Sequence, residues 1–398
     1  MNTALAGLTV LELGQIYNGP YCGLLFAQLG ADVIKLEPLG GERLRFRSTA
    51  EVETHEFVML NSDKRSVTVD IKDPLGREVV LDLVDEVDVV IENFAPGTMA
   101  RLGLEPEELC RRNPRLVYAS GKGYGSTGRY AGMTAMDITV QAMSGVIAST
   151  GFADGPPVKA GPAFVDFLGG IHLYAAAVTA LLQRSVTGRG QLVEVSMHDT
   201  VYPTLASALG GLFNNPAHRA PERTGNRHSG LAVAPYNVYP AADGWLAIIS
   251  LHERHFAAVM SVIGRPELVD DPRFIDRFAR LENIDALDAA ITDWTMQHPR
   301  WDAVKALGAL GVPCAPVLGV AEVAEDPHLI ERGMIRTVQH PRLGAVPVPG
   351  CPLRLSDSPA RDPAAAPTLA AATDDVLTEL CGYSADRIAR LRAAGAVA

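Results

Sequence analysis

The segment LTVLELGQIYNGPYCGLLFAQLGADVIKL (8–36) decides the fold class of this chain. It begins with a short apolar strand, LTVLEL, and continues with a loop from Gly14 to Gly19. Pro20 stands where the first turn of a helix tolerates a residue without an N–H group. The helix stops at Gly30, and ADVIKL (31–36) forms the next strand. A strand, a helix and a second strand in this order predict two parallel strands joined by a crossover helix.

The same rhythm continues through the first third of the chain. SVTVDIK (66–72), DVVIEN (88–93) and RLVYASGKGYG (115–125) are typical of further strands, and helical patterns separate them. We therefore predict an α/β fold with an open, mainly parallel, Rossmann-like sheet that helices cover on both faces. Sheets of this kind bind ligands at the carboxyl ends of their strands.

The composition and the hydrophobic pattern of the sequence change after the first half of the chain. Residues 214–230 (NNPAHRAPERTGNRHSG) are polar and rich in Pro and Gly, which is typical of a linker. Beyond them, YNVYPAADGWLAIIS (236–250) predicts a hairpin with Asp243 and Gly244 in its turn. Helical segments follow this hairpin, and the sequence predicts one final helix from Thr373. We predict a smaller α+β domain over residues 231–330.

Composition and charge exclude several classes of protein. The 398 residues carry a formal net charge of -11 and no dense run of Lys and Arg, which argues against a general nucleic-acid binder. The five scattered cysteines form no CxxC pair, as expected of reduced thiols. No signal-peptide pattern opens the chain, and no uninterrupted run approaches the ~18 apolar residues of a membrane span. We expect a cytoplasmic protein without a membrane partner.

Two local patterns resemble ligand sites only in part. The glycine-rich run GKGYGSTG (121–128) lacks the spacing of a phosphate loop and does not open an apolar helix, which argues against NAD or ATP binding. It is either a substrate-facing loop after a strand or a plain turn. HERH (252–255) presents two histidines without a third ligand, so we predict no metal site. The sequence contains no GxSxG elbow and no catalytic cysteine signature.

Asp166 is the acid with the most informative surroundings. In AGPAFVDFLGGIHLYAAAVTALLQ (160–183), it stands directly before a long, mostly apolar helix. One interpretation is an N-cap, whose carboxylate accepts backbone N–H groups. The other is a nucleophile at a cleft, kept ionised by the helix dipole. The local sequence by itself favours the cap.

Ordered motifs along nearly the whole chain resemble the class III CoA-transferase family, the formyl-CoA transferase-like group that also contains the α-methylacyl-CoA racemases. These motifs are LAGLTVLEL (5–13), LGADVIKLE (29–37), NSDKRSVTVDIK (61–72), DVVIENFAPG (88–97), LGLEPEEL (102–109), GKGYG (121–125), TGFADGPP (150–157), TGRGQLVEVSMHD (187–199) and GVPCAPVL (311–318). The resemblance implies a discontinuous large domain formed by residues 1–213 and 331–398, with residues 214–230 linking it to the small domain. It also implies that two chains interlock as a homodimer.

The resemblance further implies a covalent mechanism with Asp166 as the nucleophile. Its carboxylate would attack an acyl-CoA thioester and pass through an aspartyl-CoA thioester, from which CoA moves to another carboxylic acid. Acyl-CoA and the acid are then substrates, and no permanently bound cofactor is expected. The implied CoA-binding residues are Ile16, Val69, Asp70, Ile71, Lys72, Asn93, Phe94, Ala95, Arg101, Thr134 and Ala135. The implied substrate-binding residues are Gln15, Tyr17, Met136 and Asp137.

Some of these residues also have purely structural interpretations. Lys72 and Arg101 suit phosphate groups and Phe94 suits adenine. The alternatives are a solvated helix charge, a charge at a strand end and a core aromatic. Asp137 corresponds to an acid beside the reacting acyl group, or it caps another helix.

Three departures from the family pattern bear on the substrate. Met136 occupies the position of the racemases' catalytic histidine, and a thioether cannot shuttle a proton. Tyr17 replaces a glutamine of the formyl-CoA:oxalate enzymes. Their tetraglycine lid is also missing, and TGNRHSG (224–230) occupies its region. With Glu56, these residues favour an acid larger or more apolar than oxalate. We expect a CoA-transferase, with a racemase or epimerase and a non-catalytic CoA-binding protein as alternatives.

Overall fold

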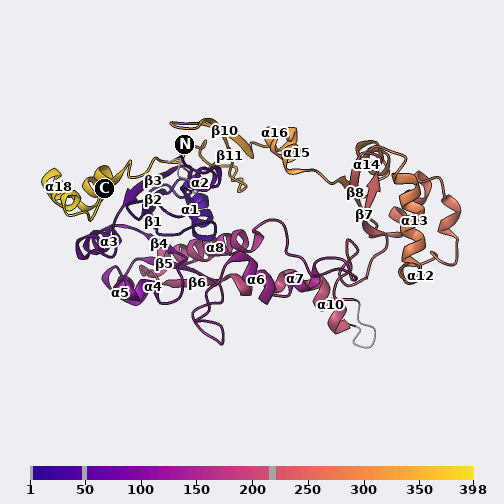
Figure 1. Cartoon of the computed structure of the whole chain (residues 1–398), viewed down its shortest axis with the longest axis horizontal. Coiled ribbons are helices and arrows are strands. Elements are labelled where there is room, and N and C mark those ends of the chain that lie inside the picture. The colour runs from indigo at the N-terminus through magenta and orange to yellow at the C-terminus, as the bar shows by residue number, and fades with distance from the viewer. Residues whose placement is uncertain (1–2, 47–51, 215–220) are drawn as a thin grey trace. The chain divides into compact units, whose positions relative to one another are not determined.

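The structure is a computed structural model that describes residues 3–46, 52–214 and 221–398 (Figure 1). Residues 215–220 of the predicted linker lie outside this description. By their internal contacts, the residues form two compact units. Unit 1 comprises Met1–Val140, Pro162–Val201 and Glu325–Ala398, and unit 2 comprises Gln141–Gly161 and Tyr202–Ala324.

A six-stranded parallel sheet forms the centre of unit 1, in the strand order β3-β2-β1-β4-β5-β6. The strands are β1 (Thr9–Glu12), β2 (Asp32–Glu37), β3 (Lys64–Thr68), β4 (Val89–Glu92), β5 (Val117–Lys122) and β6 (Leu192–Ser196). The direction of winding reverses between β1 and β4, which is the switch point at which such sheets form a ligand crevice. The predicted α/β fold with a parallel sheet is confirmed.

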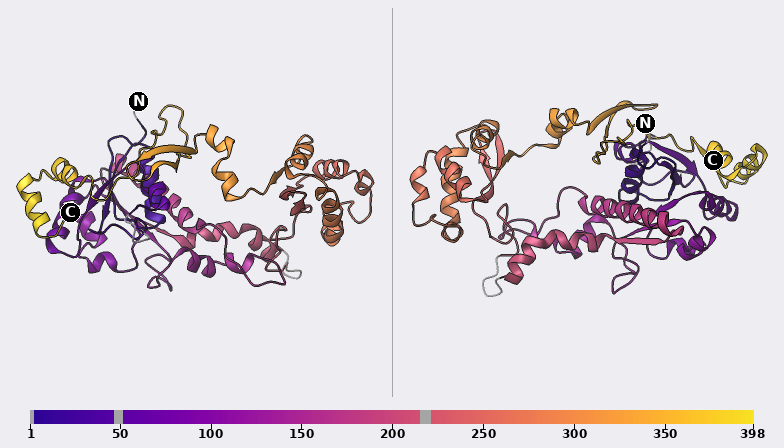
Figure 2. Two further views of the ribbon diagram at one scale, coloured as in Figure 1. Left: turned by 45° about the horizontal axis from the view of Figure 1, so that its top comes forward. Right: turned by 180° about the vertical axis from the view of Figure 1, so that it is seen from behind.

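Helices lie on both sides of this sheet (Figure 2). One side carries α1 (Asn18–Gln28) and α8 (Phe164–Thr187), and the other carries α3 (Pro74–Glu86), α5 (Pro106–Arg112), α17 (Thr373–Cys381) and α18 (Ala385–Ala393). The remaining elements of unit 1 are α2 (His55–Asn61), α4 (Thr98–Arg101), α6 (Asp137–Met143, whose last residues belong to unit 2), α9 (Met197–Val201), α16 (Pro327–Glu331) and the antiparallel hairpin of β10 (Ile335–His340) and β11 (Gly344–Pro349).

Successive residues of the central strand face opposite sides of the sheet, and both sides are buried. Val10 packs in one cluster with Leu173 of α8. Its neighbour Leu11 packs in another cluster with Val80 of α3 and Leu377 of α17. The apolar run of β1 is therefore the pattern of a strand covered on both faces.

The helix α8 is unusually long and apolar, with 24 residues. Among the described residues it is the one helix that could cross a membrane by length and composition, although polar residues interrupt its apolar sequence. Leu173, Ala177 and Ala180 on one of its sides are buried against the sheet and α1, as in a core helix. Because a crossover helix runs opposite to the strands it joins, the first turn of α8 lies at their carboxyl edge.

Two element boundaries differ from those predicted. The strand predicted over residues 66–72 is β3, which ends at Thr68, because the chain then turns into α3 with Asp73 as its N-cap. The single final helix predicted from Thr373 is two helices, separated at Gly382, which has a left-handed φ of 65°.

Unit 2 combines a small antiparallel sheet with short helices. The predicted hairpin is present as β7 (Tyr236–Ala241) and β8 (Gly244–Ile249), and β9 (Cys314–Pro316) pairs with β8. The helical elements are α7 (Val146–Ser149), η1 (Tyr202–Leu205), α10 (Ala206–Asn214), α11 (Glu253–Val262), η2 (Pro266–Val269), α12 (Arg277–Glu282), α13 (Ile284–Thr295), α14 (Arg300–Gly308) and α15 (Val320–Ala324).

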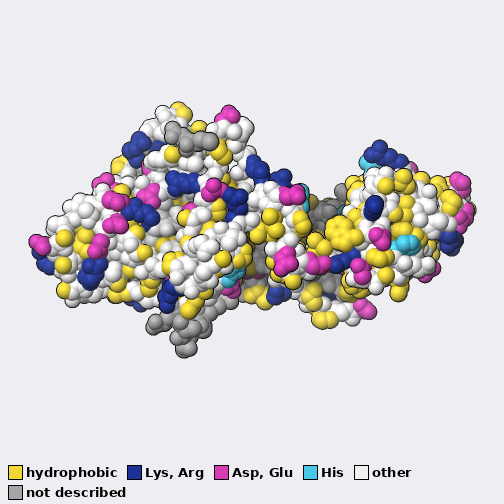
Figure 3. Space-filling view, turned by 90° about the horizontal axis from the view of Figure 1, so that it is seen from above, with side chains coloured by type: hydrophobic (Ala, Val, Ile, Leu, Met, Phe, Trp, Pro, Cys, Tyr) yellow, Lys and Arg dark blue, Asp and Glu magenta, His cyan; other side chains and the backbone are white. Residues whose placement is uncertain are grey.

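On the face shown in Figure 3, basic and acidic side chains are interspersed rather than gathered by sign.

A group of fully buried charges lies behind the sheet's first loop. The carboxylate of Glu12 pairs with the ammonium groups of Lys35 (2.9 Å) and Lys64 (2.7 Å), and none of the three side chains is exposed. A buried carboxylate between two buried ammonium groups keeps each of the three from being an isolated charge.

We expect Glu12→Ala to lower the free energy of unfolding by about 3–5 kcal/mol, because it leaves Lys35 and Lys64 buried without their counter-ion. Urea unfolding followed by circular dichroism measures this loss. The control is Glu108→Ala, which removes an exposed pair with Arg111 and should change stability by less than ~1 kcal/mol. Equal losses in the two variants would contradict the importance of the buried cluster.

Candidate active site

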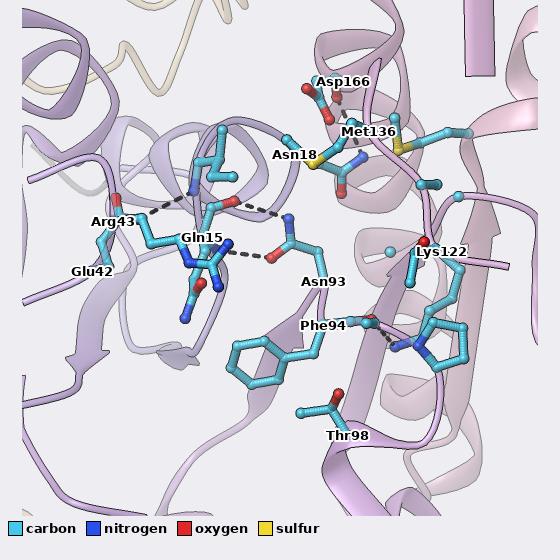
Figure 4. Close-up of a pocket in the computed structure, with 18 of the residues that line it drawn as sticks. Gln15, Asn18, Glu42, Arg43, Asn93, Phe94, Thr98, Lys122, Met136 and Asp166 are labelled. Atoms are coloured by element: carbon cyan, nitrogen blue, oxygen red, sulfur yellow. Dashed lines mark hydrogen bonds between the residues drawn. The ribbon is translucent and has the colours of Figure 1, made fainter. Parts of the chain in front are cut away.

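A cavity of about 690 Å³ lies along the carboxyl edge of the parallel sheet, within unit 1 (Figure 4). The segments that follow all six strands contribute to its wall. It is lined by Gln15, Ile16, Asn18, Pro38, Gly41, Glu42, Arg43, Lys72, Asn93, Phe94, Ala95, Pro96, Thr98, Gly121, Lys122, Gly123, Met133, Thr134, Ala135, Met136, Thr139, Asp166 and Met197. This edge is where open parallel sheets bind their ligands.

The strand order gives the cavity two chemically different ends. Lys72 follows β3 and Arg43 follows β2, so both cations lie toward the β3 side of the sheet. Within the described residues, no hydrogen bond or ion pair engages either side-chain charge. Lys122, at the end of β5, is neutralised instead by both carboxylate oxygens of Glu92 (2.8 and 2.9 Å). The unpaired positive charge is therefore confined to one end.

Most of the predicted site residues meet in this cavity. Gln15, Ile16, Lys72, Asn93, Phe94, Ala95, Thr134, Ala135, Met136 and Asp166 all line it. Of the glycine-rich run, Gly121 and Gly123 also line the wall, which favours the substrate-facing loop over the plain turn.

Other predicted residues lie outside the lining. The Tyr17 ring stacks on Phe167 with 5.8 Å between the ring centroids. The Arg101 guanidinium donates to Thr98 Oγ1 (2.8 Å) on its own helix and does not line the cavity. The remaining non-lining residues from the predicted set are Val69, Asp70, Ile71 and Asp137, and Glu56 is also outside it.

The structure corrects the local interpretation of Asp166. The N-cap of α8 is Ala163, and Asp166 lies in the first turn of the helix rather than before it. The group that caps this turn is Asp137, whose Oδ2 accepts the N–H groups of Val165 (3.0 Å) and Asp166 (3.3 Å). Asp137 is therefore the helix cap, and the Asp166 carboxylate accepts no hydrogen bond from the described residues. The acid at the cavity is left available for chemistry.

Asn18 joins the first turns of α1 and α8. Its side chain is almost fully buried, and Nδ2 donates to the backbone oxygen of Asp166 (3.3 Å). A Cβ at Gly169 would lie 2.3 Å from Asn18 Nδ2, and a Cβ at Gly121 would lie 2.4 Å from Asn18 Oδ1. Both glycines are thus required by the packing of this amide.

A profile of CoA-transferase family III matches residues 5–373. The chain belongs to CoA-transferase family III. The formyl-CoA:oxalate CoA-transferase of Streptomyces avermitilis is 34% identical over 414 residues, which cover 100% of both chains. The succinyl-CoA–D-citramalate CoA-transferase of Chloroflexus aurantiacus is 36% identical over 393 residues, 98% of this chain and 97% of that relative.

A solved structure has the same fold. The crystal structure of a CaiB/BaiF family protein from Brucella suis matches with a TM-score of 0.84 at 35% identity, over 96% of this chain and 100% of that one. The protein is therefore a class III CoA-transferase, an enzyme that moves CoA between carboxylic acids. The two named relatives are similar to it to nearly the same degree and differ in both acyl donor and acceptor.

The electrostatics of the CoA-transferase pocket oppose the expectation that the helix start keeps Asp166 ionised. Burial, and after it the negative charge of Asp137, raise the pKa of Asp166 to about 7. The N–H groups at the helix start are directed to Asp137, so they do not stabilise the Asp166 anion. A carboxyl group with a strongly perturbed pKa in a cavity is typical of a catalytic group.

No metal site accompanies this group in the described part of the chain, where no three His, Cys, Asp or Glu side chains are arranged to hold an ion. His252 precedes α11 and His255 is buried, with 5.1 Å between their ring centroids.

Several lining residues were not predicted, among them Asn18, Glu42, Arg43, Met133, Met197 and the neutralised Lys122. The rule that ligands bind at carboxyl ends of strands would have indicated Glu42 and Arg43, which closely follow ADVIKL (31–36), and Met197, which follows QLVEVS (191–196). The burial of Asn18 has no comparable signal in the sequence.

We expect Asp166→Asn to stabilise the fold, and more so at pH 8 than at pH 5. The folded-state pKa of about 7 lies above the ordinary 3.8, so the folded state loses stability as pH rises through this range. A tenfold difference in proton affinity corresponds to about 1.4 kcal/mol, which sets an upper limit of about 4 kcal/mol for the gain at pH 8. Thermal unfolding at both pH values measures it.

A matched variant for this test is Asp73→Asn at the N-cap of α3, where the carboxylate accepts the N–H groups of Leu75 and Gly76. It should give no gain at either pH, because asparagine is about as good a cap as aspartate. An equal gain in stability from Asp166→Asn at both pH values would show that the pKa of the Asp166 carboxyl group is not raised.

Proposed function

We propose that this CoA-transferase works through a covalent thioester on Asp166. An oxygen of the ionised carboxylate attacks the carbonyl carbon of an acyl-CoA, and the C–S bond breaks to release CoA thiolate. The product is a mixed anhydride between the acyl group and Asp166. The thiolate then attacks Cγ of Asp166, which frees the original acid as its carboxylate and leaves aspartyl-CoA.

The second half of the reaction reverses these steps with a different acid. The incoming carboxylate attacks aspartyl-CoA, and the released thiolate then attacks the carbonyl carbon that came from this acid. The new acyl-CoA leaves, and the Asp166 carboxylate is regenerated. No external oxidant or reductant is needed, and the thioester energy is conserved as long as water is excluded.

The observation that carries this proposal is the polarity of the cavity. CoA is a polyanion at its nucleotide end and a thioester at the other. Arg43 and Lys72 provide unpaired cations toward the β3 side of the sheet, and cations of this kind bind phosphate groups. Asp166, on α8, lines the same cavity beside Met136 (Figure 4). This arrangement supports phosphates at the β3 side and the thioester beside Asp166.

The lining also supports a substrate acid with an apolar part. Met133, Met136 and Met197 line the cavity, and methionine side chains adapt to apolar groups of different shape. A second carboxylate, as in oxalate, would need a cation there, but Lys122 is already paired with Glu92. We therefore propose a monocarboxylic acid larger than formate as the preferred substrate.

Racemisation receives no support from this geometry. The thioether of Met136 cannot transfer a proton, and Asp137 is engaged at the start of α8. Exchange of the α-proton of an acyl-CoA in deuterated water would overturn this assignment.

The decisive test is covalent trapping. Incubating the enzyme with a panel of acyl-CoA donors and carboxylic acids should produce new acyl-CoA species, which are read directly by mass spectrometry. A separate sample treated with hydroxylamine or borohydride should show a protein adduct at Asp166. Asp166→Ala should lower turnover by at least about 10³-fold, since the nucleophile is lost. Adduct formation should accelerate from pH 6 to pH 8, as the carboxyl group with a pKa of about 7 ionises.

The control for this test is Asp386→Ala, which removes another carboxylate from the first turn of a helix, on α18 and away from the cavity. It should keep full turnover. Unchanged transferase activity in Asp166→Ala would refute the proposed nucleophile.

We also propose that the enzyme is a homodimer of interlocked chains. Exposed apolar side chains support an interface: Leu182 and Val186 on α8 are 71% and 84% exposed, and Phe213 on α10 is 68% exposed. Sedimentation should give a mass of twice 42.4 kDa at micromolar concentration. A species of 42.4 kDa under these conditions would contradict the proposal.

A further inference from the structure

Ile16 adopts a backbone conformation that β-branched residues avoid. Its φ is 66°, in the left-handed region, and it lines the cavity between the cationic end and Asp166. A β-branched residue there is an outlier that persists only where its surroundings enforce it. The loop between β1 and α1 must therefore be held in place by other groups.

The backbone of Gln15 and Ile16 in this loop is bonded to the side chains of Asn93 and Glu42 (Figure 4). The amide of Asn93 clamps Gln15 on both sides, as Oδ1 accepts its N–H (2.8 Å) and Nδ2 donates to its carbonyl oxygen (2.9 Å). Glu42 Oε2 accepts the N–H of Ile16 itself (3.3 Å) and that of Leu44 (3.2 Å). Glu42 is thus the side chain bonded to the strained residue.

Glu42 is itself rigidly anchored. Only 3% of its surface is exposed, although it is one of the residues that line the cavity. Its N–H donates to Glu37 Oε2 (3.2 Å), and Glu37 forms a fully buried ion pair with Arg45 (2.6 Å). The position of Ile16 therefore depends on a chain of buried charged groups that reaches back to β2.

We infer that Glu42 is a positioning residue for acyl-CoA: its carboxylate keeps Ile16 left-handed and thereby fixes the middle of the binding wall. The inference rests on the proposed function, because it takes acyl-CoA as the ligand. Without the carboxylate, the Ile16 N–H loses its acceptor and the residue can relax to negative φ. The wall would then move while the cationic end and Asp166 remain in place.

The test compares Glu42→Ala with Glu42→Gln. Glutamine retains an oxygen that can accept the same N–H groups, whereas alanine does not. Calorimetric titration with CoA itself should give a dissociation constant about tenfold higher for Glu42→Ala, the loss expected for one hydrogen bond to a charged acceptor. Glu42→Gln should stay within about threefold of the unsubstituted enzyme.

Steady-state kinetics separate positioning from a general loss of folded enzyme. In Glu42→Ala, the KM for acyl-CoA should rise about tenfold while the KM for the acceptor acid stays unchanged, because the loop contacts the CoA part of the ligand. A smaller fraction of folded enzyme would lower kcat and leave both KM values unaltered. Amide hydrogen exchange at residues 14–18 should also become faster.

The control is Asp82→Asn on α3, which weakens hydrogen bonds from Tyr383 and Arg387 far from the cavity and should leave CoA affinity unchanged. If Glu42→Ala does not fold, Glu42→Asp, which is too short to reach Ile16, takes its place with the same expected loss. Equal CoA affinity in the unsubstituted, Ala and Asp forms would overturn the positioning role. Failure of the unsubstituted enzyme to bind CoA would instead refute the proposed function.

Discussion

The carboxyl edge of the sheet depends on how the loop from Gly14 to Pro20 is held from behind by buried charges. Lys35 and Lys64, both paired with Glu12, donate to the carbonyl oxygens of Gly14 and Pro20, respectively. Burial lowers the pKa of Lys64 to about 8, although Glu12 opposes this effect. The two ammonium groups provide donors for carbonyl oxygens of this irregular backbone. They thus fix the loop that lines the cavity, at the switch point between β1 and β4.

The surroundings of Asp166 in this cavity destabilise its ionised carboxylate, and with it the folded state. A carboxylate that accepted the N–H groups of its own helix would be a better cap and a weaker nucleophile, since those bonds stabilise the anion. Here Asp137 takes the N–H groups, and its charge adds to the burial that raises the pKa of Asp166. Catalytic groups commonly lie in such unfavourable surroundings, and the rest of the fold compensates for them.

Most of the fold and about half of the site could be predicted from the sequence, for a physical reason. Strand and helix patterns are local, and the edge rule indicates where their ends form a binding wall. Asn93 and Lys72, which the family resemblance implied, line the cavity at this edge. The identity of the cap on α8 could not be predicted in this way, because the chain brings Asp137 to Val165 by tertiary packing. The burial of Asn18 against Gly169 and the contact from Glu42 to Ile16 join segments distant in sequence for the same reason.

The separation of charge along the cavity also bears on how one family accommodates different acids. On the proposed function, the nucleotide half of the ligand meets segments after β2, β3 and β4, whereas the acyl half meets Met133, Met136 and Met197. Substitutions at the methionine end would change the acid without disturbing the contacts to CoA. Formyl-CoA:oxalate and succinyl-CoA–D-citramalate enzymes, at 34% and 36% identity to this chain, are consistent with that division. Overall sequence identity between family members is then a poor indicator of the acid that each uses. The residues at the three methionine positions are a better indicator.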